Sequence, residues 1–258
     1  FFVMYYLIIW WILDLHKKYE SELKHHTAQV EFQRDQMGEL NKNLDRVVYT
    51  VTHDLRAPLN SLLGLLSLME NANKEETLEY RALMQKQIAA MKSYIQEIVE
   101  YNRNAKTKVE EQAVVLADLL QEVIDTVKDN ADKNLHVDLI VPRQIMITSD
   151  PLRVKVILSN LIGNSVKYSD PLKPQNIIKI EVKQLRGLIE TTITDNGIGI
   201  AEEHLAKIFD MFYRATDRQE GTGLGLFIVK ETIEKLGGQI SVSSELGIGT
   251  TFKFTLPA

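Results

Sequence analysis

Apolar residues recur at alternating steps of three and four over residues 30–51, with Gln33 at one of these steps. This spacing predicts helices that pack along a seam, as in a coiled coil. Continuing the steps puts the next seam position at 54, so His53 lies one residue off the seam, on a flank expected to face water. The apolar seam residues are Val30, Met37, Leu40, Leu44, Val47 and Val51.

A helical hairpin is predicted next. Its first helix continues to Met69 and ends in the asparagine-rich residues 70–74, and its second helix runs from about residue 75 to residue 102. Each helix carries one apolar stripe that a lone hairpin cannot bury, so two copies should pair as a four-helix bundle, which predicts a homodimer. The stripes consist of Leu59, Leu62, Leu63, Leu66 and Met69, and of Met84, Ile88, Met91, Ile95 and Ile98.

The periodicity changes after a polar linker, which we place at residues 105–112. Short β-rich runs then alternate with helical stretches, which predicts an α+β two-layer sandwich with helices on one face of a sheet. The predicted strands are residues 137–141, 177–182, 189–194, 239–243 and 251–256, and the predicted helices are about residues 116–131, 150–167 and 223–236.

Residues 1–13 are wholly apolar. At about 1.5 Å per residue they span roughly 20 Å, less than the roughly 30 Å of a bilayer core. We interpret them as the end of a transmembrane helix that begins upstream, with the basic residues 16–18 on the cytoplasmic side. The full-length protein is then expected at the cytoplasmic face of the cell membrane, and residues 14–46 are expected to form a signalling coiled coil. A buried helix of a soluble domain is the alternative.

Composition limits the number of domains, the kinds of partner and the kinds of metal site that are expected. A chain of 258 residues is long enough for about two domains. The net charge is −5 and no basic stripe is interleaved with aromatic residues, so nucleic acid is not an expected partner. Cysteine is absent, which excludes disulfides and thiolate metal sites.

His53 has neighbours that suit a reactive site. Asp54 follows it, Arg56 brings a cation, and Pro58 interrupts the backbone hydrogen bonds of the helix nearby. A solvated histidine on a helix flank is the alternative, so the decision depends on the rest of the chain.

A second group of polar residues lies on one predicted helix. Asn160, Asn164, Lys167 and Tyr168 occur at i, i+4, i+7 and i+8, so they share a face. Amide, ammonium and phenol groups on one stripe suit Mg²⁺ with phosphates and a sugar. Asparagine is disfavoured in the middle of a helix, so a capping role does not explain the two asparagines.

Three further motifs are weak when taken separately. Residues 195–200, Asp-Asn-Gly-Ile-Gly-Ile, follow a strand and are by default a turn. Residues 203–214 form an amphipathic stretch that ends in Arg214. Residues 221–226, Gly-Thr-Gly-Leu-Gly-Leu, lead into a helix and would bind an anion. A dinucleotide fold would need a strand directly before these glycines, where the polar residues 216–220 stand instead.

Taken in order, these motifs resemble the sequence boxes of sensor histidine kinases, over about residues 40–258. Residues 247–252 also resemble the closing glycine-threonine element of that family. The matching boxes are residues 53–59 (H box), 160–168 (N box), 195–200 (G1 box), 208–214 (F box) and 221–226 (G2 box).

The resemblance implies a dimerisation and phosphotransfer domain at residues 47–104 and a Bergerat ATP-binding fold at residues 113–258. It implies autophosphorylation of His53 by ATP, followed by transfer to an aspartate of a response regulator receiver domain. Asp54 would orient the imidazole and Arg56 would help with phosphate charge.

The resemblance also implies the nucleotide contacts. Asp195 would accept the adenine amino group, Asn164 would hold Mg²⁺, Arg214 would reach the γ-phosphate, and residues 201–220 would form a mobile lid. The implied ATP-binding residues are Asn160, Asn164, Lys167, Tyr168, Asp195, Gly197, Gly199, Arg214, Gly221, Thr222, Gly223, Leu224, Gly225, Leu226 and Thr250.

The sequence departs from the family pattern at Ala57. The family commonly has Thr or Asn four residues after the histidine, where it can orient a water, so weak phosphatase activity is expected. Two alternatives to a kinase are a non-catalytic dimeric scaffold that binds nucleotide and a Bergerat-type ATPase related to chaperones or topoisomerases.

Overall fold

The computed structural model describes residues 2–130, 134–142, 145–215 and 222–258, and in parts of its first helix it describes the backbone without the side chains. The chain divides into two compact units, one that ends at Gln87 and one that spans Ile88–Ala258. Helix α2 (Lys74–Lys106) passes from the first unit into the second.

The first unit consists of α1 (Phe2–Met69) and the start of α2. Helix α1 runs on through Pro58. The turn between the helices is closed by Asn73, whose Oδ1 accepts hydrogen bonds from the backbone N–H groups of Glu75 and Glu76, each at 2.9 Å. Glu76 accepts one in return from the Asn73 N–H at 2.8 Å, which completes a capping box. The asparagine-rich stretch therefore ends one predicted helix and starts the next.

Apolar side chains of this hairpin are exposed in the single chain. Leu63 is 62% exposed and Ile88 is 54% exposed, and both belong to the predicted stripes. Of the predicted seam, Met37, Leu40, Leu44 and Val47 have side chains outside the described ones.

Over the residues that the structure describes, none of the helices contains a segment with the length and hydropathy needed to cross a membrane.

The second unit is built on a mixed five-stranded sheet of order β2-β4-β5-β7-β6, in which only β2 and β4 pair in parallel. A separate two-stranded antiparallel sheet joins β1 to β3. The strands are β1 (Gln112–Val115), β2 (Leu135–Ile140), β3 (Met146–Ser149), β4 (Asn176–Leu185), β5 (Leu188–Asp195), β6 (Gln239–Glu245) and β7 (Gly249–Pro257).

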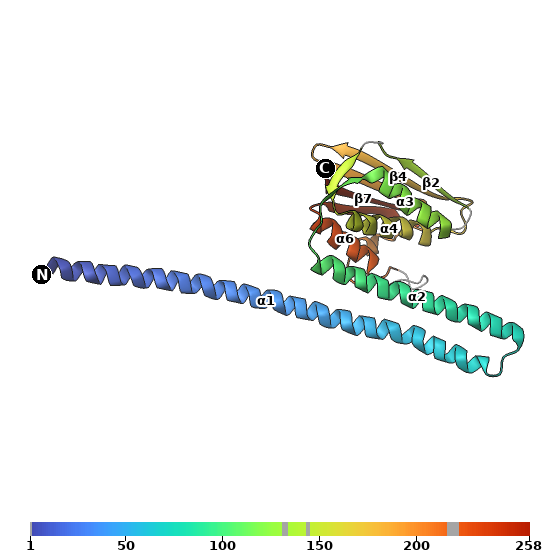
Figure 1. Ribbon diagram of the computed structural model, residues 1–258, viewed down its shortest axis with the longest axis horizontal. Helices are drawn as coiled ribbons and strands as arrows, with labels where there is room; N and C mark the ends of the chain where they lie inside the picture. Colours follow the sequence, from blue (N-terminus) through green and yellow to red (C-terminus); the bar gives the residue numbers. More distant parts are fainter. Residues whose placement is uncertain (1, 131–133, 143–144, 216–221) are drawn as a thin grey trace. The chain divides into compact units, whose positions relative to one another are not determined.

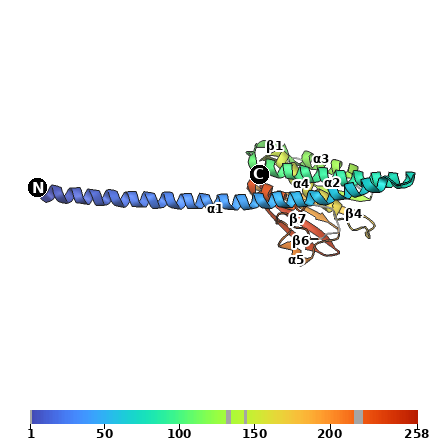
Figure 2. The ribbon, with the colours of Figure 1, turned by 90° about the horizontal axis from the view of Figure 1, so that it is seen from below.

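Helices α3 (Leu116–Asn130), α4 (Pro151–Lys167) and α6 (Gly225–Lys235) cover one face of the five-stranded sheet (Figures 1 and 2). Alternate residues of each central strand point into this layer and are almost fully buried, as β-strand geometry requires. The core joins residues of α4 to residues of three strands. These are Leu158, Leu161 and Ile162 with Ile178, Ile180, Ile193 and Phe254.

The predicted α+β sandwich is confirmed, with helices on one face of the sheet. The expected helices and strands of this unit are all present, with boundaries shifted by a few residues. The short elements β1, β3 and α5 (Glu202–Leu205) were not predicted, because four residues show too little periodicity. Helix α2 also continues to Lys106, which is farther than the predicted end at residue 102.

Candidate functional site

Helix α4 carries the polar stripe predicted from the sequence. Its N-terminus is capped by Asp150, whose carboxylate accepts hydrogen bonds from the N–H groups of Leu152 and Arg153. Further along, Asn160 donates its side-chain N–H to the Val156 carbonyl at 2.9 Å. Its side-chain oxygen is therefore directed away from its own helix, toward Gly225.

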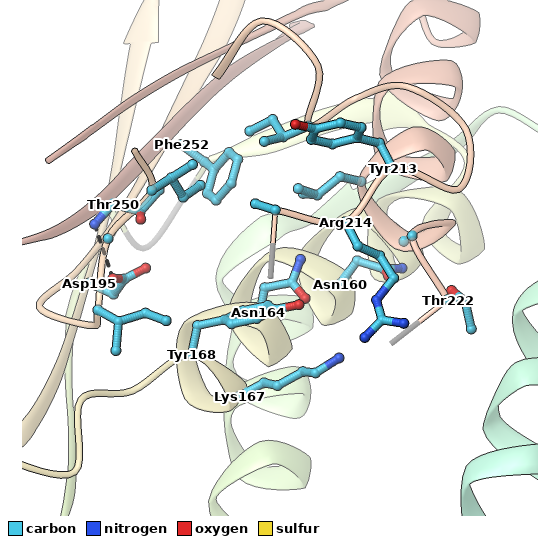
Figure 3. A pocket seen from close by; sticks show the side chains of 18 of the residues that line it. Asn160, Asn164, Lys167, Tyr168, Asp195, Tyr213, Arg214, Thr222, Thr250 and Phe252 are labelled. Atoms are coloured by element: carbon cyan, nitrogen blue, oxygen red, sulfur yellow. Dashed lines mark hydrogen bonds between the residues drawn. The ribbon is translucent and has the colours of Figure 1, made fainter. Parts of the chain in front are cut away.

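The stripe forms one wall of a cavity of about 160 Å³ (Figure 3). The other walls come from the turn after β5, the segment before α6, and β7. Most of the predicted nucleotide residues line this cavity. They are Asn160, Asn164, Lys167, Tyr168, Asp195, Gly199, Arg214, Thr222, Gly223, Gly225, Leu226 and Thr250.

Asp195, at the end of β5, is held by three hydrogen bonds. Its Oδ1 accepts the N–H groups of Gly197 at 2.9 Å and Thr250 at 3.1 Å, and its Oδ2 accepts the Ser165 hydroxyl at 3.1 Å. Burial raises the pKa of this carboxyl above its ordinary value, although the three hydrogen bonds and Lys173 act in the opposite direction. The result is a fixed acceptor in a partly desolvated site.

Close backbone packing explains the glycines beside Asp195. A Cβ on Gly197 would lie 2.4 Å from the carbonyl oxygen of Tyr168, and a Cβ on Gly249 would lie 2.0 Å from the carbonyl oxygen of Asp195. The turn after β5 and the start of β7 can approach this closely only without side chains. Gly197 does not line the cavity, and its part is to orient Asp195.

The segments before α6 meet at Gly223. Both Gly223 and Phe212 have positive φ, at 71° and 64°, and the Phe212 N–H donates to the Gly223 carbonyl at 3.1 Å. A Cβ on Gly225 would lie 2.7 Å from the side-chain oxygen of Asn160, so a larger residue at the start of α6 would displace the Asn160 side chain. Leu224, the residue directly before α6, is buried. The predicted residue Gly221 and lid residues 216–220 lie outside the described residues.

Cations gather at one end of the cavity. Figure 3 shows Lys167 and Arg214 extending toward the end at which Thr222 lies. The Lys167 ammonium lies 5.2 Å from the ring centroid of Tyr168. Burial raises the pKa of the Tyr168 hydroxyl, and the nearby Arg214 guanidinium partly offsets this. Two positive groups beside a glycine-rich helix start suit phosphate groups.

Glu97, on the second half of α2, is a cavity residue that sequence reasoning missed. Its carboxylate accepts a hydrogen bond from the Thr222 hydroxyl and lines the same end as the cations. Burial raises the pKa of this carboxyl, while the hydrogen bond from Thr222 and the charge of Lys167 act in the opposite direction. The apolar lining residues Phe252 and Ile200 were also missed. In a sequence, both are ordinary core residues.

The described residues contain no cluster of three or more histidine and acidic side chains that could hold a metal ion by themselves. The cavity does offer the amide of Asn164 next to the cationic end. Magnesium needs few protein ligands where phosphates and waters supply the others, so the residues present fit a magnesium ion that enters with a nucleotide.

His53 belongs to the first unit and is exposed, with 68% of its side chain open to solvent. Its Nδ1 lies 3.1 Å from Oδ1 of Asp54, so these adjacent residues do meet. The ring also stacks on Tyr49, with centroids 6.4 Å apart and planes 20° from parallel. Arg56 is exposed on the same helix. The His53 side chain is thus open to solvent in the single chain.

Two family models match the chain. Residues 43–106 match the His Kinase A (phospho-acceptor) domain, and residues 149–258 match the histidine kinase-, DNA gyrase B-, and HSP90-like ATPase. The first matched segment contains His53 and Glu97, and the second contains the cavity residues from Asn160 onward.

Proteins with similar sequences agree with these two family matches. Autoinducer 2 sensor kinase/phosphatase LuxQ of Vibrio cholerae is 31% identical over 80% of this chain and 25% of its own length. Sensor histidine kinase AtsR of Burkholderia thailandensis is 29% identical over 80% of this chain and 36% of its own. The chain therefore spans about a third or less of the length of these relatives.

Among solved structures, full-length ShkA in complex with AMPPNP is similar, with a TM-score of 0.58 and 27% identity. The similarity covers 81% of this chain and 44% of that protein.

Proposed function

The chain belongs to the sensor histidine kinase family, and from this premise we propose that it is an ATP-dependent autokinase that phosphorylates His53. The phosphoryl group would then pass to an aspartate of a response regulator receiver domain, in two-component signal transduction. The observation that carries the proposal is the cavity, in which a half-buried carboxylate lies among glycine turns and two cations gather with Asn160 and Asn164.

We infer that ATP binds with adenine at Asp195 and phosphates toward Lys167 and Arg214. The free lone pairs of the Asp195 carboxylate suit the exocyclic amino group of adenine, and the apolar wall around Phe252 and Ile200 suits its ring. Asn160, Tyr168 and the Thr222–Leu226 segment would surround the ribose and phosphates. Gly197, Leu224 and Thr250 would act by fixing the turns.

Asn164 would hold Mg²⁺ together with the phosphate oxygens. The ion would neutralise charge on the phosphates, while the phosphoryl transition state is loose and depends mainly on positioning. Lys167 and Arg214 would add fixed positive charge at the same end.

Phosphoryl transfer requires a neutral imidazole with a free nitrogen. We propose that Nδ1–H of His53 donates to Asp54, which leaves the lone pair on Nε2. As the bond between the γ-phosphorus and the bridging oxygen breaks, Nε2 bonds to phosphorus and ADP leaves. The proton stays on Nδ1, where Asp54 balances the positive charge of the ring. The exposed position of His53 lets another domain reach it.

The assembly is part of the same proposal. The exposed apolar stripes of the hairpin support a homodimer formed as a four-helix bundle, with further pairing along residues 14–46. The proposed domains are the end of a transmembrane helix at residues 1–13, the coiled coil, residues 47–104 for dimerisation and phosphotransfer, a linker at 105–112 and the ATP-binding domain at 113–258. The full-length protein would act at the cytoplasmic face of the membrane.

Labelling tests the proposal against both alternatives. The chain would be incubated with Mg²⁺ and ATP labelled in its γ-phosphate. Label on the protein that is acid-labile, alkali-stable and lost in His53→Gln identifies the kinase. Free phosphate without protein label identifies an ATPase, and bound nucleotide with neither product identifies a scaffold. The matched control is His136→Gln, which changes another exposed histidine that also pairs with an aspartate, and it should keep the label.

A further inference from the structure

Lys173 lies in the loop between α4 and β4, outside the cavity. It contacts two turns beside Asp195, the turn after β5 and the turn that leads into β7. Its side chain crosses from one turn to the other and places its ammonium among backbone carbonyl oxygens. The distances from Nζ are 2.7 Å to Asn196, 3.2 Å to Gly197, 2.9 Å to Gly247 and 2.9 Å to Ile248.

The number of oxygens distinguishes this arrangement from ordinary hydrogen bonding. An ammonium has three N–H donors, so four oxygens cannot each receive a donor of their own. The carbonyl dipoles instead converge on a central positive charge, in the manner in which backbone carbonyls replace the water around a potassium ion. Without a cation between them, the four oxygens would repel one another.

The sequence before Lys173 fixes its backbone. Asp170 accepts hydrogen bonds from Leu172 N–H to its side chain at 3.0 Å and from Lys173 N–H to its carbonyl at 3.1 Å. This turn carries Pro171 and is followed by Pro174, which restricts the chain on both sides of the lysine. The Lys173 side chain therefore extends from a turn whose backbone conformation is restricted.

The caged carbonyls belong to the turns that orient Asp195. Gly197 and Thr250 both donate their N–H groups to Asp195 Oδ1. The two turns also join directly, since Gly247 N–H donates to the Ile198 carbonyl at 2.7 Å. The distance between the turns thus sets the direction of the Asp195 carboxylate.

We propose that Lys173 is a positioning residue whose ammonium takes the place of a bound monovalent cation, and that this cation holds the two turns at the spacing that aims Asp195 at adenine. The adenine contact rests on the proposed function. The cage itself rests only on the four contacts. Shortening Lys173 to alanine should leave a site of four carbonyls that a free potassium or ammonium ion can fill, because these ions have similar radii.

The test measures ADP affinity of the full chain by calorimetry, in choline, sodium, potassium or ammonium chloride at equal ionic strength. In choline, Lys173→Ala should bind ADP about tenfold more weakly than the wild type, since charge-assisted hydrogen bonds are lost. Potassium and ammonium should restore most of this affinity and sodium should restore less, because sodium prefers shorter distances to oxygen. The wild-type affinity should not depend on the cation.

Two variants serve as controls. Lys179→Ala removes an exposed lysine of β4 and should bind ADP like the wild type in every salt. Lys173→Met keeps the bulk of the side chain without its charge, so it should lose affinity and not recover it in potassium. Recovery that is specific to Lys173→Ala separates a cation cage from a general effect of ionic strength.

The melting temperature of Lys173→Ala is measured in the same four salts, without nucleotide. It should rise in potassium and ammonium above its value in choline, even if the variant folds poorly. Equal melting temperatures and equal ADP affinities in all four salts would overturn the inference. If the wild type binds no ADP, the proposed function fails, while the melting temperatures still decide whether the cage holds a cation.

Discussion

The region around His53 and the cavity of the second unit, which we propose as the phosphoacceptor site and the nucleotide site, are built in opposite ways. His53 is exposed on α1, and the contacts described for it come from residues close in sequence, Asp54 and Tyr49. Asp195 is held by Ser165, Gly197 and Thr250, of which Ser165 and Thr250 lie far along the chain. The surroundings of His53 thus need one helix and two residues close in sequence, whereas the cavity needs segments that lie far apart along the second unit.

Because of this difference, mutations at His53 and mutations in the cavity should have different effects. Changes at the exposed histidine should remove chemistry and leave folding and nucleotide binding intact. Changes in the cavity should alter binding and stability together, since the side chains that orient the turns are also the ones that we propose to contact the nucleotide.

The largest expected effect is at Asp195. Asp195→Asn keeps an oxygen for the Gly197 and Thr250 N–H groups but puts an amide N–H₂ where adenine donates its own hydrogens. We expect ATP affinity to fall roughly tenfold to a hundredfold, the loss of one charged hydrogen bond. Calorimetric titration with ATP measures this effect. Affinity equal to that of the wild type would place adenine elsewhere.

The pH dependence of the same residue sharpens the contrast. Burial raises the pKa of Asp195, so its ionisation at neutral pH costs folding stability. A carboxyl whose pKa is higher in the folded state than in the unfolded state stabilises the fold at a pH below its unfolded pKa. This contribution is lost as the pH rises through the pKa of the folded state. Asp195→Asn should therefore melt at a higher temperature than the wild type at neutral pH, and the difference should shrink as pH falls toward the ordinary carboxyl pKa. A lower melting temperature at neutral pH would contradict this.

A smaller effect on ATP affinity, opposite in sign to that at Asp195, is expected at Glu97. Its carboxylate shares the cationic end of the cavity, so it should repel the phosphates of ATP. Removing this charge in Glu97→Gln should strengthen ATP binding by roughly 1 kcal/mol, about fivefold. Glu100→Gln removes the same charge one turn along α2 from a residue that does not line the cavity, and it should bind like the wild type. An equal gain in both variants would indicate a general charge effect.

The smallest expected effect on the kinase reaction is at Ala57. Ala57→Thr supplies a hydroxyl one helical turn after His53, which can orient a water. We expect faster dephosphorylation of a phosphorylated receiver domain and unchanged autophosphorylation. Ala57→Val has the same shape without the hydroxyl and should not gain activity. Strong dephosphorylation by the wild type, unchanged in Ala57→Thr, contradicts the expectation.

The sequence predicted those features that a local pattern can express. The stripe of Asn160, Asn164, Lys167 and Tyr168 follows from helical periodicity, and the position of His53 follows from the seam. Glu97 could not be predicted, because its place in the cavity depends on how the second half of α2 packs in its unit. Lys173 was also missed, because an ordinary lysine in a proline-containing loop carries no sign of four carbonyls that two distant turns bring together around it.

The pairing of Asp54 with His53 could be proposed from sequence but not settled there, since adjacent helical residues point about 100° apart. The 3.1 Å contact shows that side-chain rotation overcomes this separation. The contact makes the choice of nitrogen the most specific feature of the proposed chemistry.

Phosphorus NMR of the autophosphorylated chain, combined with mass-spectrometric mapping of the modified peptide, tests this chemistry most directly. The proposed mechanism predicts a single phosphohistidine at His53, with phosphorus bonded to Nε2, because Nδ1 is engaged with Asp54. Phosphate on Nδ1, or on any other residue while His53 stays unmodified, would contradict it.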